Sequence, residues 1–240
     1  MRARCWQLLL VFVVSLPAAT AWACGVSGPD GVWSCSFEEH EEELRPRWNV
    51  GVAGMLTATS LRFGDAGRGD QSRTGAVISA AYAPTPRLRL QASVGAALGG
   101  ELRMPNGTHR FKPGPTAAVG VGYRLLSGMP FLALTAVLST STARTHHEMQ
   151  EATRYTAFDL RLGAAFGATF FDALSPYALA RVFGGPVFWR YEGKAVTGTD
   201  AYHFQVGAGL AWRIVERIDV FIEGVPLGER VLSGGASAIF

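Results

Sequence analysis

The sequence predicts an all-β protein, an antiparallel up-and-down β-barrel that spans a membrane with about ten strands, or eight as the alternative. Three observations support this fold class. Small and apolar residues alternate with polar ones at a period of two, helix-period stripes are absent, and short and long polar segments alternate between the apolar stretches. A soluble β-sandwich also alternates, but it seldom uses glycine as freely as this chain, which has 29 glycines.

The C-terminal segment that ends at Phe240 shows the alternation most simply. Leu232 and Phe240 fall on one face, and Ser233 and Ser237 fall on the other. A strand between lipid and a crowded polar lumen has this pattern. The segment resembles the closing strand of Gram-negative outer-membrane β-barrel proteins, whose terminal Phe is read by the insertion machinery. The resemblance implies that Phe240 is an assembly signal, and that this machinery, membrane lipid and lipopolysaccharide are partners.

The N-terminus indicates export. Arg2 and Arg4 precede the apolar run 8–14, and residues 21–23 (Ala-Trp-Ala) form a small-x-small cleavage site. This order predicts a cleaved signal peptide over 1–23, and with it an outer-membrane protein whose N- and C-termini are periplasmic. Cleavage leaves Cys24 first, so lipidation of Cys24 is an alternative. No later stretch holds about 18 consecutive apolar residues, so no transmembrane helix is expected.

Residues 24–46 are predicted to form a periplasmic N-terminal extension. Cys24 and Cys35 remain after cleavage, and the turn-forming residues between them favour a disulfide in an oxidising compartment. A zinc site lacks further ligands, because His40 is the only histidine nearby. The acidic run 38–43 is interpreted as solvated charge, with a contact to a basic partner or a cation as the alternative.

Charge and motifs exclude several functions. The formal net charge falls from +3 to +1 when Arg2 and Arg4 leave with the signal peptide. A nearly neutral chain gives no reason to expect nucleic acid as a partner. No P-loop, dinucleotide fingerprint or zinc signature is present, so no cofactor and no metal are expected.

The barrel itself is predicted over 47–240, with a register that places apolar residues outward. Strands are expected at 48–58, 74–82, 88–96, 117–124, 132–138, 158–163, 178–182, 203–212, 219–223 and 230–240. The third is the clearest, because Leu88 and Leu90 oppose Arg89 and Gln91. The sequence Gly-Gly-Pro at 184–186 indicates a bend, since proline cannot donate to a ladder.

The connections between these strands alternate in length. Long polar loops are predicted at 63–73, 99–115, 142–154 and 191–199, and short turns at 84–86, 127–130, 172–176 and 214–217. Outer-membrane barrels combine long external loops with short periplasmic turns. The short connection at 226–229 departs from the pattern. Aromatic residues near the predicted strand ends favour an interfacial girdle. They are Trp48, Tyr82, Tyr123, Trp189, Tyr191, Trp212 and Phe240.

Seven charged residues fall on the inward face of this register. They are Arg89, Arg124, Asp159, Arg161, Arg181, Asp219 and Glu223. Isolated charges are costly to bury, so these side chains are expected to pair across strands. They form either a structural plug of salt bridges or the lining of a passage for an anionic solute. A barrel of about ten strands encloses little free space once side chains fill it, which favours the plug.

Two enzyme classes give alternatives. Histidines and acids of the predicted loops are similar in type to those of omptin proteases, ten-stranded barrels whose His and Asp groups activate water at the outer mouth. They are His146, His147, Glu148, Asp65 and Asp70. A paired His–Asp strand motif is not evident. Barrels that modify lipid A need a Ser, a His and an acid, and the sequence offers Ser139, Ser141 and His146.

No catalytic residue is assigned from the sequence. The favoured function is that of an integral outer-membrane barrel with a largely plugged lumen and a structural or surface-interaction role. A narrow porin-like channel is the alternative, and an omptin-like surface protease is the second alternative.

Overall fold

The computed structural model describes residues 47–126, 130–147, 150–171, 173–215 and 217–240. The expected signal peptide (1–23) and the expected extension (24–46), with its predicted Cys24–Cys35 disulfide, lie outside the described residues. No helix of the described part is long and apolar enough to cross a membrane.

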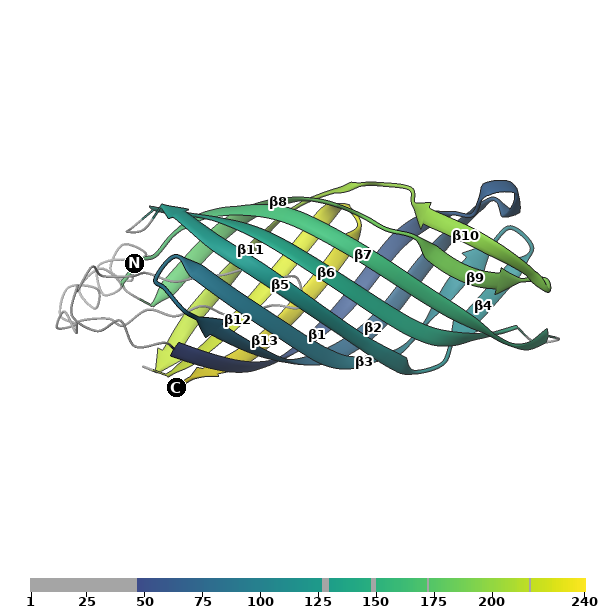
Figure 1. The fold of residues 1–240 in the computed structure, drawn as a ribbon. Helices are drawn as coiled ribbons and strands as arrows, with labels where there is room; N and C mark the ends of the chain where they lie inside the picture. The colour runs from purple at the N-terminus through teal and green to yellow at the C-terminus, as the bar shows by residue number, and fades with distance from the viewer. Residues whose placement is uncertain (1–46, 127–129, 148–149, 172, 216) are drawn as a thin grey trace, which may run out of the picture.

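Ten antiparallel strands form a closed ring, which confirms the predicted fold class and strand number (Figure 1). They are β1 (Arg47–Arg62), β2 (Arg68–Ala83), β3 (Leu88–Met104), β5 (Gly114–Leu126), β6 (Pro130–His147), β7 (Gln150–Ala168), β8 (Leu174–Gly184), β11 (Phe204–Val215), β12 (Ile218–Gly228) and β13 (Arg230–Ile239). Pairing of β1 with β13, from Asn49↔Ile239 to Ala58↔Arg230, closes the ring. The ring therefore leaves no strand edge open to lipid.

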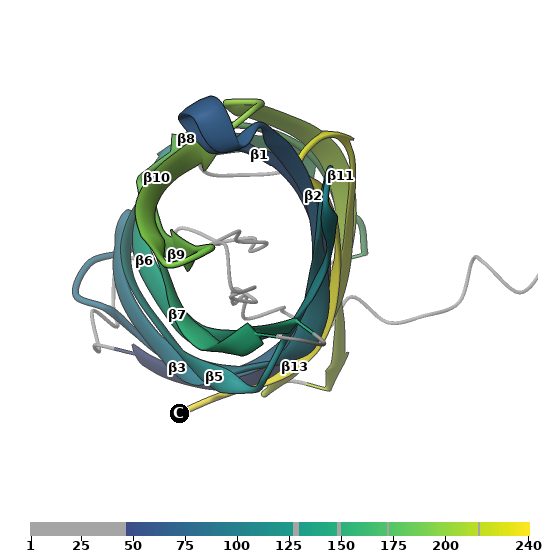
Figure 2. The same ribbon diagram turned by 90° about the vertical axis from the view of Figure 1, so that its right-hand side faces the viewer.

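Three further strands lie at one end of this ring: β4 (Gly107–Phe111), β9 (Val187–Tyr191) and β10 (Lys194–Asp200). There β3 and β6 exchange their partner β5 for β4, β7 exchanges β8 for β9, and β1 exchanges β13 for β10. The ladder at this end runs β1, β2, β3, β4, β6, β7, β9 and β10 and returns to β1. The barrel thus narrows from ten strands to eight, and Figure 2 views it from the narrow end.

Most residues of the predicted long loops belong to strands instead. β1 continues to Arg62, β3 to Met104 and β6 to His147, and only a short 3₁₀ turn, η1 (Gly64–Ala66), lies between β1 and β2. Those loop predictions were wrong because the strands extend beyond the apolar band. Outside the band their outward residues are polar, as in a loop, while their inward residues remain buried.

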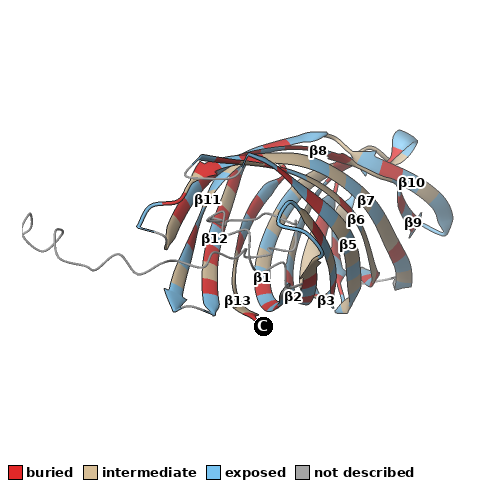
Figure 3. Ribbon diagram, turned by 60° about the vertical axis from the view of Figure 1, so that its left-hand side comes forward, coloured by how far each residue is buried: buried red, intermediate tan, exposed pale blue. Residues whose placement is uncertain are grey.

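The register places apolar side chains outward and polar or small ones inward, as Figure 3 shows by the alternation of exposed and buried residues along each strand. Leu160 and Val206 face outward with 49% and 42% of their surface exposed, whereas Ser93 is buried. On β1 the outward residues turn polar at Ser60 and Arg62. An exposed apolar surface of this kind around a closed ring is the lipid-facing band of a transmembrane barrel.

Two of the aromatics assigned to a girdle lie elsewhere. Trp189 and Tyr191 are buried on β9, inside the narrow end. Their strand lies beyond the apolar band. The inward and outward alternation inferred for the strands inside the band therefore does not predict which side chains of β9 face outward. Trp48, Trp212 and Phe240 are exposed, and backbone hydrogen bonds join Trp48 to Phe240 at the wide end.

Candidate functional site: the barrel lumen

All seven charged residues assigned to the lumen point inward, and five of them are buried. The most deeply buried ion pair of the described residues joins β8 to β12. Arg181 Nη2 lies 2.9 Å from Glu223 Oε1, and the Tyr177 hydroxyl donates to Glu223 Oε2 at 3.1 Å. Both β8 and β12 flank β11, so these side chains cross the inner surface of β11. Gly209 on β11 makes this possible, because a Cβ there would collide with the Tyr177 ring.

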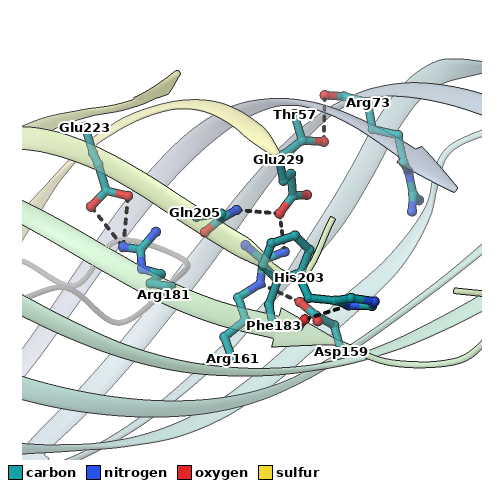
Figure 4. Close-up of polar contacts among 10 residues, drawn as sticks. All are labelled: Thr57, Arg73, Asp159, Arg161, Arg181, Phe183, His203, Gln205, Glu223 and Glu229. Atoms are coloured by element: carbon teal, nitrogen blue, oxygen red, sulfur yellow. Dashed lines mark hydrogen bonds and ion pairs between the residues drawn. The ribbon is translucent and has the colours of Figure 1, made fainter. Parts of the chain in front are cut away.

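A second network lies nearer the narrow end (Figure 4). Arg161 on β7 pairs through Nε with Asp159 and through Nη2 with Glu229 Oε2, the latter at 2.8 Å. Gln205 Nε2 donates to the same Glu229 oxygen at 2.6 Å. The guanidinium also lies over the Phe183 ring, 5.3 Å from its centroid. The two networks together place cross-strand ion pairs on the side of the ring formed by β7, β8, β11 and β12.

The remaining predicted lumen charges gather near the wide end. Asp219 Oδ1 lies 3.3 Å from Arg213 Nε, and Arg89 is among the charges that act on the same carboxyl. Arg124 is completely buried, with its guanidinium carbon 5.9 Å from the centroid of Phe131.

Aromatic side chains fill the eight-stranded end. We call this group the aromatic plug; it consists of Phe63, His109, Phe111, Tyr155, Trp189 and Tyr191, all buried. The Trp189 ring lies 5.4 Å from Phe63 and 4.9 Å from His109, measured between ring centroids. Its Nε1 donates to Thr145 Oγ1 at 2.9 Å, which satisfies the indole N–H inside the ring.

A polar cavity of about 170 Å³ lies in the lumen and touches both the plug and the Arg161 network. Its lining includes Arg73, Tyr155, Asp159, Asp200 and Glu229. In Figure 4 the Arg73 side chain lies to the right of the Arg161 network and apart from it. The cavity therefore has a cationic side chain on β2 and a group of acids on β7, β10 and the β12–β13 connection.

Sequence reasoning missed three of these residues, Arg73, Asp200 and Glu229, because they fall in or beside segments predicted as loops. Parity would have found Arg73, which lies at an even spacing from the buried Val77 and Ala81 of β2.

The residues proposed for hydrolysis do not come together. His146 and Asp70 are both exposed on the outside of the barrel, on β6 and β2, with β3 and β4 between these strands. Asp65 is exposed in η1, Glu148 lies outside the described residues, and nothing is described of the His147 side chain.

The residues compared with lipid A-modifying enzymes also separate. Ser139 and Ser141 line the cavity, whereas His146 faces the opposite side of β6. Within the described residues, no group of three or more His, Cys, Asp or Glu side chains could hold a metal ion.

Neither a family model nor a curated protein matches the sequence. Solved structures of similar fold include the outer membrane protease OmpT from Escherichia coli, with a TM-score of 0.49 and 11% identity over 81% of this chain and 96% of that one. The translocator domain of autotransporter NalP from Neisseria meningitidis gives 0.48 and 10%, over 84% and 90%. The outer membrane protein OprG from Pseudomonas aeruginosa gives 0.40 and 8%, over 81% and 95%. These neighbours are outer-membrane β-barrels of different roles, and the likeness concerns the fold alone.

Proposed function

We propose that the protein is an integral outer-membrane β-barrel with a non-conducting lumen and its narrow end outside the cell, where it holds anionic lipid. The aromatic plug inside the eight-stranded end supports the non-conducting lumen. Eight strands leave an interior just wide enough for side chains to fill, and six buried aromatic rings occupy it here. The Arg181–Glu223 pair forms a second barrier below the cavity.

A row of arginines supports both the orientation and the lipid contact. Arg144 on β6 pairs directly with Arg154 on β7, and the Tyr155↔Trp189 pair puts Arg190 of β9 beside Arg154. All three side chains are exposed, and none has an ion-pair partner among the described residues. Like charges placed opposite each other on neighbouring strands destabilise a sheet unless an anion lies between them.

The row lies next to the apolar band. Phe188 is two residues before Arg190 on the same outward face, and its ring lies 6.3 Å from that of Phe158. Guanidinium groups at this height meet lipid headgroups, and they bind phosphate bidentately. The phosphate-bearing lipopolysaccharide of the outer leaflet supplies the matching anion.

Planar-bilayer recording tests the closed lumen. The refolded protein, checked for heat-modifiable gel mobility, is expected to give no steady current steps. Steady ion-selective steps that vanish in an unfolded control would overturn the closed lumen. They would favour a narrow channel, the second candidate, for which the polar cavity and its charged lining are the supporting observation.

Titration with purified lipid A in a neutral detergent tests the lipid contact. Lipid A is expected to raise the thermal midpoint of the wild type, and the triple change R144Q/R154Q/R190Q is expected to lose most of that rise. The control R103Q/K194Q changes two other exposed basic residues and is expected to keep it. An equal rise in the triple variant would reject the arginine row as a lipid site.

A surface-protease function remains a further proposal, to be tested by peptide hydrolysis. Loss of measured hydrolysis in H146A, H147A or D65N, relative to the wild type, would support it. Full retention in all three would remove these residues from consideration.

A further inference from the structure

We infer that the lumen cavity is a binding site for a small zwitterionic solute, which bears a carboxylate for Arg73 and an amine for Asp159 and Asp200. This site is separate from the arginine row, and the inference does not depend on whether the lumen conducts. The cavity size sets the scale of the solute, because a cavity of about 150 Å³ accommodates a molecule of about six heavy atoms. At about 170 Å³ the lumen cavity suits a solute of this class.

Arg73 is the anchor for the carboxylate. Its Nη1 donates to Ser141 Oγ at 3.0 Å, and its guanidinium carbon lies 4.8 Å from the ring centroid of Phe111 and 5.7 Å from that of Tyr155. Nε and Nη2 are buried and have no acceptor among the described residues. These two donors form one edge of the planar group, the edge that grips a carboxylate with two parallel hydrogen bonds.

The local structure does not compensate the Arg73 charge. No ion pair of Arg73 occurs within the described part of the chain, although desolvation of a cation is costly. The aromatic faces and one hydroxyl hold the group in place but supply no negative charge. Arg73 lines the cavity, so a carboxylate in the cavity is the acceptor that the site assigns to this unpaired edge.

The other side of the cavity is acidic. Asp159, Asp200 and Glu229 line it together with the single cation Arg161, which already pairs with Asp159 and Glu229. Asp159 Oδ1 is buried and has no donor among the described residues. A simple anion would satisfy Arg73 but would add negative charge beside these acids, whereas a zwitterion satisfies both sides and buries no net charge.

The acidic side of the cavity lies at the step in the barrel wall, where β1 changes its partner. Between Ala58 and Leu61, β1 changes its partner from β13 to β10, and the next residue of the connection, Ala201, donates its N–H to the Ser60 carbonyl. Asp200 and Glu229 lie at this step and both line the cavity. The acidic side of the site is therefore at the level where the wall changes from ten strands to eight.

Calorimetric titration of the refolded full chain with γ-aminobutyrate, butyrate and butylamine tests the site. We expect saturable binding of γ-aminobutyrate, with butyrate and butylamine about tenfold or more weaker, because each lacks one charged contact. No saturable binding of γ-aminobutyrate would overturn the site. Butyrate bound as tightly as γ-aminobutyrate would overturn its zwitterionic class.

Variants assign the two ends of the solute. R73Q is expected to weaken γ-aminobutyrate binding about tenfold or more, and R73K to weaken it less, because lysine keeps the charge but not the paired donors. D159N is expected to reduce the preference for γ-aminobutyrate over butyrate. R103Q, an exposed change on β3, is the matched control and is expected to bind as the wild type does. Unchanged binding in both R73Q and R73K, each with the gel mobility of the folded barrel, would reject Arg73 as the anchor.

Discussion

Leu61 of β1 pairs with Asp200 of β10, three residues after Ala58 has made the last β1 pair with β13. Together with the exchange of β8 for β9 by β7, this change of partner brings the β9–β10 hairpin into the wall and leaves β8, β11, β12 and β13 out of it. The interior narrows at the same level, so the aromatic plug fills the lumen above and the polar cavity lies beneath it. Asp200 thus belongs both to the wall and to the cavity.

The position of Asp200 predicts a pH dependence of stability. Asp200 lies in β10, outside the apolar band, and burial first, then the nearby Asp159 carboxylate, raises its pKa from 3.8 to about 6. Between these values the unfolded chain has released the proton while the folded chain still holds it. The free energy of unfolding contributed by this group therefore falls as the pH rises from about 4 to about 6, and it is level above that.

Urea unfolding of wild type and D200N between pH 4 and pH 7 measures this contribution. The free energy of unfolding of D200N is expected not to fall over this pH range. That of D65N, which changes an exposed acid in η1, is expected to fall as in the wild type. Parallel pH profiles for wild type and D200N would contradict the assignment.

The register predicts a difference between two levels of the outward face of the wall. Arginine at Leu160, which faces outward within the apolar band, should cost about 2–4 kcal/mol of folding free energy in lipid vesicles near the midplane. Arginine at Ser72, outward on β2 but beyond the band, should cost much less because it meets water. Equal costs in refolding titrations would mean that the band does not lie at Leu160.

The Arg181–Glu223 pair predicts a coupling energy. Removal of one partner by R181M or E223M leaves the other charge buried and should cost about 3–5 kcal/mol. The double variant R181M/E223M should cost less than the two single changes together, because it leaves neither charge unpaired. A double-mutant cycle on unfolding free energies measures the difference, and strict additivity would show that the two side chains do not interact.

The exposed position of Phe240 predicts that its deletion changes the rate of membrane insertion. The Phe240 ring is exposed on the outside of the wide end, so its deletion removes little packing. The change should slow insertion by the assembly machinery far more than it lowers the stability of the folded barrel. Reconstituted insertion assays compare the two rates, with Trp212→Ala as a control for the loss of an exposed aromatic side chain. Equal rates with and without Phe240 would remove its role as a signal.

Much of the site lay within reach of the sequence. The positions of Arg181 and Glu223 on the inward face follow from parity alone, because each lies in a strand whose opposite face is apolar. Arg73 and Glu229 were not predicted, because their outward neighbours are polar and the segments were interpreted as loops, although the even spacing of Arg73 from Val77 places it inward. The alternation of inward and outward residues also does not show which charged side chains form ion pairs. Arg161 pairs with Glu229, which lies far along the chain and was not among the predicted residues.

By itself, the sequence determined the barrel class, the ten membrane strands and which side chains face lipid. The physical reason is that successive side chains of a strand point to opposite faces, and lipid accepts only apolar ones over the band. Only the tertiary structure decided that the wall narrows to eight strands and that a polar cavity lies below an aromatic plug. These features depend on which distant strands share hydrogen bonds, as Leu61 and Asp200 do, and a period of two carries no information about the partner.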